Sequence, residues 1–206
     1  NARIASLSKP YIVLMDGLVM GAGIGVSAHG RHRIVTSRTR FAMPETQIGF
    51  LPDAGGTWLL GQRGPAGTYL ALTGASIGAG DLLHLGLADY CVDPTTIADL
   101  TQRLSQATTA DDVSAILAAA QTPAPPAMLI EHENLLSQAF ETENIEMSID
   151  VLQKSGGVFA EEACARLLSA SPTSLKLTCR LLKLAHRAAR LEDELINEYR
   201  AACSLL

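Results

Sequence analysis

Residues 1–92 alternate short apolar runs with glycine-containing turns, a pattern typical of short buried strands and helices. The apolar runs predict strands at residues 11–15, 33–36, 41–42 and 88–92. The intervening segments predict helices at residues 21–30, 57–62, 65–72 and 79–84. Asp16-Gly17 forms a turn after the first strand, and Gly86 ends the last of these helices. Strands that alternate with helices predict an α/β fold.

From residue 95 onward, apolar positions recur at helical spacing, as in Val113, Ile116, Leu117 and Ala120. Helices are predicted at residues 95–107, 110–120, 129–140, 143–154, 158–170, 174–189 and 192–206. The proline-rich segment 122–126 interrupts them as a linker. We therefore expect an α/β region at residues 1–121, whose last elements are the helices at residues 95–107 and 110–120, and a helical C-terminal region at residues 127–206.

The amino-acid composition excludes several classes of protein. Of 206 residues, 48% are hydrophobic and 18% are charged, which is typical of a globular chain rather than a disordered one. A net charge of −5 argues against nucleic acid as the main partner, because phosphate binding needs clustered cations. The uncharged stretch 113–130 contains Pro123, Pro125 and Pro126, which break a helix, so we expect no membrane span.

The cysteine pattern indicates the compartment of the protein, and the first residue bears on whether the chain has been processed. Cys91, Cys164, Cys179 and Cys203 lie far apart in the sequence, so neither a disulfide framework nor a metal site is expected. A reducing compartment such as the cytoplasm fits this pattern. The chain begins at Asn1 without a Met or a leader pattern, which suggests a processed chain or a piece of a longer one.

The glycine-rich segment Gly21-Ala22-Gly23-Ile24-Gly25 has three interpretations. Gly23-x-Gly25-x-x-Ala28 with Glu45 downstream fits a dinucleotide-binding fingerprint. Small residues at a helix start also allow a helix to pack closely against a strand, without any ligand. Finally, the unsatisfied N–H groups at the helix start could stabilise an oxyanion.

Several motifs together resemble the crotonase (enoyl-CoA hydratase/isomerase) superfamily. They are Lys9-Pro10-Tyr11, Asp16-Gly17, Met20-Gly21-Ala22-Gly23, Phe41-Ala42-Met43-Pro44-Glu45-Thr46-Gln47-Ile48-Gly49, Pro52-Asp53-Ala54-Gly55-Gly56, Leu72-Thr73-Gly74 and Gly86-Leu87-Ala88-Asp89. The resemblance is greatest to the 3-hydroxyisobutyryl-CoA hydrolase branch, which shares Met-Pro-Glu-Thr, Pro-Asp-x-Gly-Gly and a helical end resembling Ser171-Pro172-Thr173-Ser174 and Glu198-Tyr199-Arg200. It implies a crotonase-like core of ββα repeats followed by a mainly helical part.

The resemblance also implies roles for individual residues. The middle position of the glycine triplet, Ala22, would supply an oxyanion amide between Gly21 and Gly23. Hydratases of this superfamily use two glutamates, and the first of these positions is Gly25 here, which argues against hydration. The second position is Glu45, and the hydrolase branch adds Asp53. From the residues alone, Glu45 could equally be a solvated loop carboxylate, and Asp53 could cap a helix starting at Ala54.

These implications favour an acyl-CoA thioester hydrolase of valine catabolism, with acyl-CoA as substrate and no separate cofactor. The resemblance places such an enzyme in the cytoplasm, or in the mitochondrial matrix of a eukaryote. An enoyl-CoA hydratase/isomerase is one alternative. Members of the superfamily also have a preceding half that supplies the other oxyanion amide. A non-catalytic fragment that forms a homo-oligomer, or associates with that N-terminal portion, is therefore the second alternative.

Overall fold

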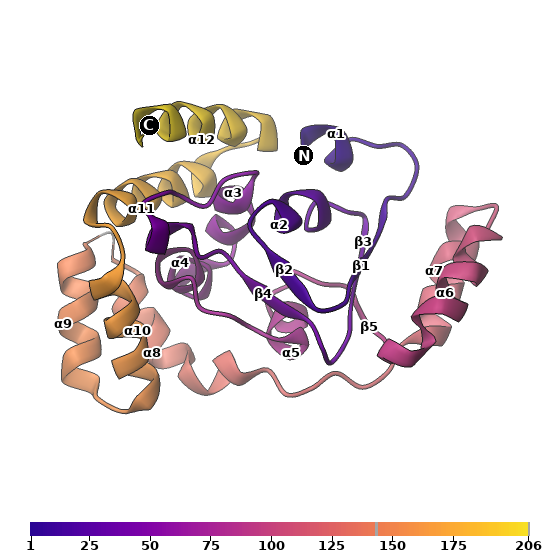
Figure 1. Ribbon diagram of the computed structural model, residues 1–206, viewed down its shortest axis with the longest axis horizontal. Coiled ribbons are helices and arrows are strands. Elements are labelled where there is room, and N and C mark those ends of the chain that lie inside the picture. The colour runs from indigo at the N-terminus through magenta and orange to yellow at the C-terminus, as the bar shows by residue number, and fades with distance from the viewer. Residues whose placement is uncertain (143, 206) are drawn as a thin grey trace. The chain divides into compact units, whose positions relative to one another are not determined.

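The computed structural model describes residues 1–142 and 144–205 (Figure 1). The chain forms two compact units, and each is made of three separate stretches of the sequence. The first unit contains Asn1–Val19, Val26–Phe41 and Ile77–Met128. The second contains Met20–Gly25, Ala42–Ser76 and Leu129–Leu206. The chain passes between the units for the last time directly after the Pro-rich segment that was predicted as a linker.

The first unit is built on a three-stranded parallel sheet in the order β1-β3-β5. These strands are β1 (Ile12–Met15), β3 (His32–Val35) and β5 (Tyr90–Cys91). Val13 pairs with Arg33, and Ile34 pairs with Tyr90. Two further strands, β2 (Leu18–Met20) and β4 (Arg40–Ala42), pair with each other. The order β1-β2-α2 followed by β3-β4 and a helix matches the ββα repeats that the resemblance to the crotonase superfamily implied.

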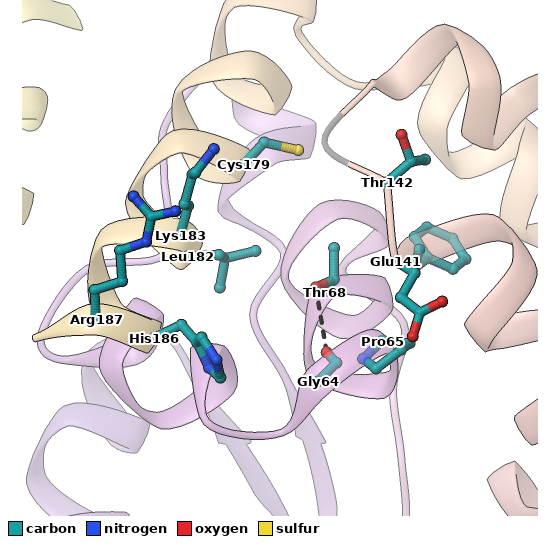
Figure 2. Close-up of a pocket in the computed structure, with 12 residues that line it drawn as sticks. Gly64, Pro65, Thr68, Glu141, Thr142, Cys179, Leu182, Lys183, His186 and Arg187 are labelled. Carbon is teal, nitrogen blue, oxygen red and sulfur yellow. Dashed lines mark hydrogen bonds between the residues drawn. The ribbon is translucent and has the colours of Figure 1, made fainter.

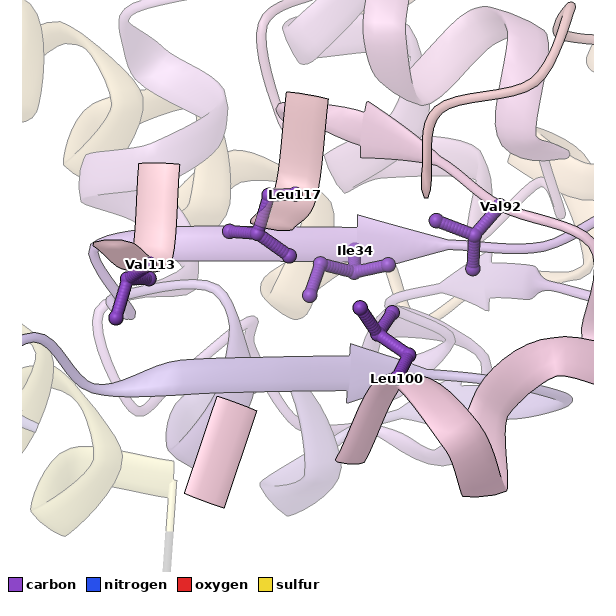
Figure 3. Close-up of a cluster of buried hydrophobic side chains, with 5 residues drawn as sticks. All are labelled: Ile34, Val92, Leu100, Val113 and Leu117. Carbon is purple, nitrogen blue, oxygen red and sulfur yellow. The ribbon is translucent and has the colours of Figure 1, made fainter. Parts of the chain in front are cut away.

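A hydrophobic core fixes the C-terminal helices of the first unit to its sheet (Figure 3). The helices of this unit are α1 (Ala2–Ala5), α5 (Ala79–His84), η2 (Pro94–Thr96), α6 (Ile97–Ser105) and α7 (Ala110–Ala120). Ile34 of β3 packs with Leu100 of α6 and Leu117 of α7, and all three are at most 1% exposed. The helical spacing of the apolar residues in α7 therefore reflects this burial.

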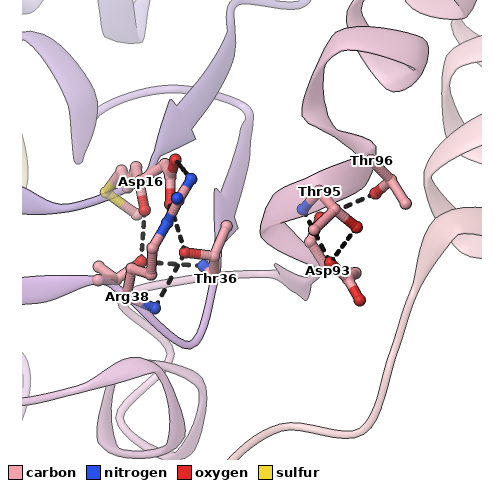
Figure 4. Close-up of polar contacts among 8 residues, drawn as sticks. Asp16, Thr36, Arg38, Asp93, Thr95 and Thr96 are labelled. Atoms are coloured by element: carbon pink, nitrogen blue, oxygen red, sulfur yellow. Dashed lines mark hydrogen bonds and ion pairs between the residues drawn. The ribbon is translucent and has the colours of Figure 1, made fainter.

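Two aspartates fix turns of the first unit (Figure 4). Asp16, in the turn after β1, accepts hydrogen bonds from Thr36 Oγ1 at 2.6 Å and Arg38 Nε at 2.9 Å. These contacts hold the pKa of Asp16 below its usual value. Asp93 caps η2 by accepting from the N–H of Thr95 at 2.8 Å. Both turns are thus set by local side chains.

The second unit is mainly helical. Its elements are η1 (Glu45–Ile48), α3 (Gly56–Gly61), α4 (Gly64–Thr73), α8 (Glu133–Phe140), α9 (Ile145–Ser155), α10 (Val158–Ser169), α11 (Pro172–Arg187) and α12 (Leu191–Leu205). Two elements, α2 (Ala22–Ser27) and η3 (Met128–His132), lie where the chain passes between units. Helix α3 packs against α4, α11 and α12. The approach to α4 is so close that a β-carbon on Gly67 would lie 1.9 Å from the carbonyl oxygen of Leu60.

Most predicted elements occur, with shifted ends. The predicted helices at residues 79–84 and 110–120 are confirmed at the same bounds. Strand β2 was not predicted, β5 is shorter than predicted, and residues 128–132 form a 3-10 helix. The predicted helices 143–154 and 192–206 each include one residue, Glu143 and Leu206, outside the described part of the chain. In the described residues, no helix combines the length and apolar character needed to cross a bilayer.

Candidate active site

Glu45 is the first residue of η1 and one of the most enclosed carboxyl groups of the second unit. Its side chain is 7% exposed, and its Oε2 is buried without a hydrogen-bond partner in the structure as described. Burial is the main cause that raises the pKa of Glu45 to about 7; its own backbone N–H lowers the pKa, and the negative charge of Asp53 makes a smaller contribution that raises it. A carboxyl group with a pKa near neutrality can both accept and release a proton at physiological pH.

The motifs around Glu45 hold it in this buried place. The Thr46 hydroxyl donates to the carbonyl of Leu72 at 2.9 Å, and the Thr46 carbonyl accepts from the N–H of Ser171 at 3.1 Å. Gly74 follows α4 at φ +61°, where a β-carbon would lie 2.8 Å from Pro44 Cα. The Met-Pro-Glu-Thr and Leu-Thr-Gly motifs therefore pack directly against each other, and the lack of a β-carbon at Gly74 allows this close approach.

The glycine-rich segment lies directly beside the Glu45 carboxyl. Gly21 has φ +51°, and a β-carbon added to it would lie 3.3 Å from Glu45 Oε1. Ala22 opens α2, where the first amides of a helix have no intrahelical acceptor. In the described residues, Ala54 alone has a positive φ among the non-glycines, so Ala22 has a negative φ and its methyl group fits this position. Ala22 and Gly23 are exposed to solvent.

Asp53 lies in the loop between η1 and α3. It is half-buried, and burial raises its pKa above the usual range. The predicted alternative, that Asp53 caps a helix starting at Ala54, is wrong because α3 begins at Gly56 with Gly55 as its N-cap. The negative charge of Asp53 contributes to the raised pKa of Glu45.

The side chain that accepts from the first amides of α3 comes from α12, and no local sequence pattern indicates it. Glu198 Oε2 accepts from the N–H of Gly55 at 2.7 Å, and Glu198 Oε1 accepts from the N–H of Thr57 at 3.0 Å. Because 141 residues separate Thr57 from Glu198, this contact arises only from the packing of α12 on α3. The only signal was that Glu198 belongs to a motif shared with the hydrolase branch.

A separate pocket of about 280 Å³ lies between α4, the end of α8 and α11 (Figure 2). Lys183, His186 and Arg187 of α11 form one wall, and Glu141 lies on the opposite side. Neither Glu45 nor Asp53 lines this pocket.

The remaining predicted alternatives find less support. Gly23 and Gly25 lie inside α2 rather than in the turn before it, so the dinucleotide fingerprint lacks its phosphate-binding turn. Arg33 of β3 is bound to Asp89 through two side-chain hydrogen bonds of 3.0 and 2.7 Å. Within the described ranges no group of three or more His, Cys, Asp or Glu side chains could hold a metal ion.

Comparison with known proteins agrees with this architecture. The family model described as enoyl-CoA hydratase/isomerase matches residues 1–206. The 3-hydroxyisobutyryl-CoA hydrolases of Mus musculus and Bos taurus, both named as mitochondrial, are 37% and 38% identical over 97% of this chain. The chain covers 54% of each, so it spans about half the length of these relatives.

Two solved structures share the fold closely. A carnitinyl-CoA dehydratase from Mycobacterium thermoresistibile is 38% identical with a TM-score of 0.92, over 99% of this chain and 59% of that one. An enoyl-CoA hydratase from Rhodobacter sphaeroides 2.4.1 is 33% identical with a TM-score of 0.88, over 98% of this chain and 58% of that one. The chain thus has a crotonase-like fold and belongs to the enoyl-CoA hydratase/isomerase family.

Proposed function

We propose that the protein containing this chain is an acyl-CoA thioester hydrolase that acts on 3-hydroxyisobutyryl-CoA. The observation that carries the proposal is the buried Glu45 carboxyl, with a pKa of about 7, beside both Gly21 and the charge of Asp53. The absence of a side chain at Gly25 removes the second glutamate that hydration would use. The relatives named as 3-hydroxyisobutyryl-CoA hydrolases support the choice of substrate.

Glu45 is the proposed base. Its ionised carboxylate takes a proton from water, and the resulting hydroxide adds to the thioester carbonyl carbon. The negative charge then develops on the carbonyl oxygen, which accepts from the N–H of Ala22 in the segment Gly21-Ala22-Gly23. Collapse of this intermediate breaks the C–S bond, and the proton held by Glu45 passes to the CoA thiolate. Asp53 orients the water or Glu45 itself.

A nucleophilic role for Glu45 uses the same geometry. In that route the carboxylate attacks the carbonyl carbon and expels CoA, and water then hydrolyses the acyl-enzyme anhydride. Both routes require an ionised, accessible Glu45. The substrate is the acyl-CoA itself, and neither route requires a separate cofactor.

A hydratase or isomerase is the second candidate, favoured by the two structural neighbours named as a dehydratase and a hydratase. A third possibility is that this portion contributes only packing or oligomer contacts, in a homo-oligomer or with a preceding N-terminal portion. The proposed location is the cytoplasm, or the mitochondrial matrix in a eukaryote; the relatives of Mus musculus and Bos taurus are named as mitochondrial.

Release of CoA thiol from 3-hydroxyisobutyryl-CoA by the full-length protein tests the proposal. Glu45→Gln should lower kcat by about 10²- to 10⁴-fold, the range for loss of a general base. Glu161→Gln makes the same chemical change at an exposed position of α10 and should retain wild-type kcat. Equal activity of Glu45→Gln and Glu161→Gln would contradict the proposed role of Glu45.

A further inference from the structure

Two carboxyl groups of α12, Glu194 and Glu198, are buried against the start of α3. Their exposed fractions are 0% and 3%. Glutamates are almost never fully buried unless they are paired or hydrogen-bonded, because loss of hydration penalises the charge. The contacts that hold these two groups therefore need a structural or functional explanation.

Glu198 binds the backbone on both sides of Gly56. One carboxyl oxygen accepts from the N–H of Gly55 at 2.7 Å, and the other accepts from the N–H of Thr57 at 3.0 Å. The second oxygen also lies 2.5 Å from the Thr57 hydroxyl. A carboxylate is an acceptor for all three donors, so Glu198 satisfies the first turn of α3 as a cap from another helix.

The Thr57 hydroxyl links Glu198 to Glu194. It lies 3.1 Å from Glu194 Oε1, but a hydroxyl has one proton and can donate to one of the two carboxyl groups only. The other contact is satisfied when Glu194 or Glu198 carries a proton. Burial raises the pKa of both groups, and that of Glu198 to about 7. One proton shared within the pair therefore removes the repulsion between two buried charges.

The backbone held by Glu198 is the loop that carries Asp53. Directly after Asp53, Ala54 has φ +56° and Gly55 has φ +80°, so two successive residues are left-handed. Alanine disfavours this conformation, and surrounding contacts must maintain it. The carbonyl of Asp53 accepts from the N–H of Gly56 at 2.7 Å, which closes the loop next to the amides that Glu198 binds.

We infer that Glu198, supported by Thr57 and Glu194, is a positioning residue that fixes the place of the Asp53 carboxyl by holding the loop 53–57. The inference rests on the proposed function for the role of Asp53 in the reaction. Glu198 touches no reacting atom in this account and acts through Asp53. A displacement of the loop by about 1 Å is expected to cost up to about 10²-fold in rate.

A double-mutant cycle in the full-length protein tests the link to Asp53. Glu198→Gln keeps the shape of the side chain but places an amide NH₂ against a backbone N–H, and should lower kcat for thiol release by about 10- to 100-fold. Because it acts through Asp53, it should lower the rate of an Asp53→Asn protein by less than about 2-fold. Asp193→Asn, an exposed change on α12, should retain wild-type kcat. Full additivity of Glu198→Gln and Asp53→Asn would overturn the inference.

Substitutions of Thr57 provide a second test, which disturbs the fold less than Glu198→Gln does. Thr57→Val removes the hydroxyl and keeps the N–H bond to Glu198, and it should lower kcat several-fold. Thr57→Ser restores the hydroxyl and should recover wild-type kcat. Equal losses in Thr57→Val and Thr57→Ser would indicate a packing role and would overturn the positioning role.

Hydrogen–deuterium exchange tests the loop without reference to activity. A peptide spanning residues 50–58 should exchange at least several-fold faster in Glu198→Gln, while a peptide spanning residues 97–105 should be unchanged. Unchanged exchange at residues 50–58 would overturn the inference whatever the kinetics. If the wild-type protein releases no thiol, the proposed function fails, and the exchange result still decides whether Glu198 holds the loop.

Discussion

Replacing Glu45 with glutamine should make the protein more stable at alkaline pH while removing its proposed base. The Glu45 side chain is 7% exposed, and its Oε2 has no hydrogen-bond partner in the described structure. Burial raises its pKa from 4.5 to about 7. Each pKa unit corresponds to about 1.36 kcal/mol, so the ionised form destabilises the fold by about 3 kcal/mol at high pH.

The sign of the pH dependence follows from this rise. An unfolded Glu45 ionises near pH 4.5, whereas the folded one stays protonated up to about pH 7. The unfolded state therefore loses its proton first, and the free energy of unfolding falls as pH rises through this window. Between about pH 5 and about pH 8, the contribution of Glu45 to the free energy of unfolding falls by about 2 to 3 kcal/mol.

The assay compares urea unfolding of the wild-type and Glu45→Gln proteins at pH 5 and pH 8. Glu198 is buried in both proteins and contributes the same pH dependence, so the difference between the two proteins isolates Glu45. The free energy of unfolding of the wild type should fall by about 2 to 3 kcal/mol more than that of Glu45→Gln between the two pH values. An equal loss in both proteins would refute the conclusion that Glu45 is buried with a raised pKa.

Three further outcomes follow from the same geometry. Asp53→Asn should lower kcat and move the acid limb of the pH profile of kcat/KM to lower pH, because the negative charge of Asp53 raises the pKa of Glu45. A pH–rate profile of both proteins tests this. Gly21→Ala should cost about 1 kcal/mol or more in the free energy of unfolding, because φ is +51° and its β-carbon would lie 3.3 Å from Glu45 Oε1; urea denaturation measures it. Gly67→Ala should lower the free energy of unfolding by about 2 kcal/mol or more, because its β-carbon would lie 1.9 Å from the Leu60 carbonyl oxygen. Thermal unfolding should show a much lower midpoint, and an unchanged midpoint would contradict the packing of α3 on α4.

The sequence predicted the elements whose pattern is local. Helix α7 has apolar residues at helical spacing, and this local pattern predicted its position; the structure adds a capping box at Thr109 and Asp112 that fixes its first residue. Strand β2 has three residues and pairs with β4, and its short apolar run gave no periodic signal. The 3-10 helix at residues 128–132 was predicted as α-helix because the two patterns overlap over one turn.

The candidate site was predicted only in part, for a physical reason. Glu45 and Asp53 were named from motifs, but whether Glu45 is buried or solvated depends on contacts of η1 with α4 and α11. Glu198 caps the Asp53 loop from a helix more than 140 residues away along the chain. No local pattern encodes such a contact, because it exists only once α12 packs on α3.

The proposed reaction is tested most directly by comparing two substrates with the full-length wild-type protein. With 3-hydroxyisobutyryl-CoA, the account predicts release of free CoA thiol, with loss of the activity in Glu45→Gln. With crotonyl-CoA, it predicts no addition of water to the double bond, because Gly25 supplies no second carboxyl group. Hydration of crotonyl-CoA without thiol release from either substrate would contradict the account.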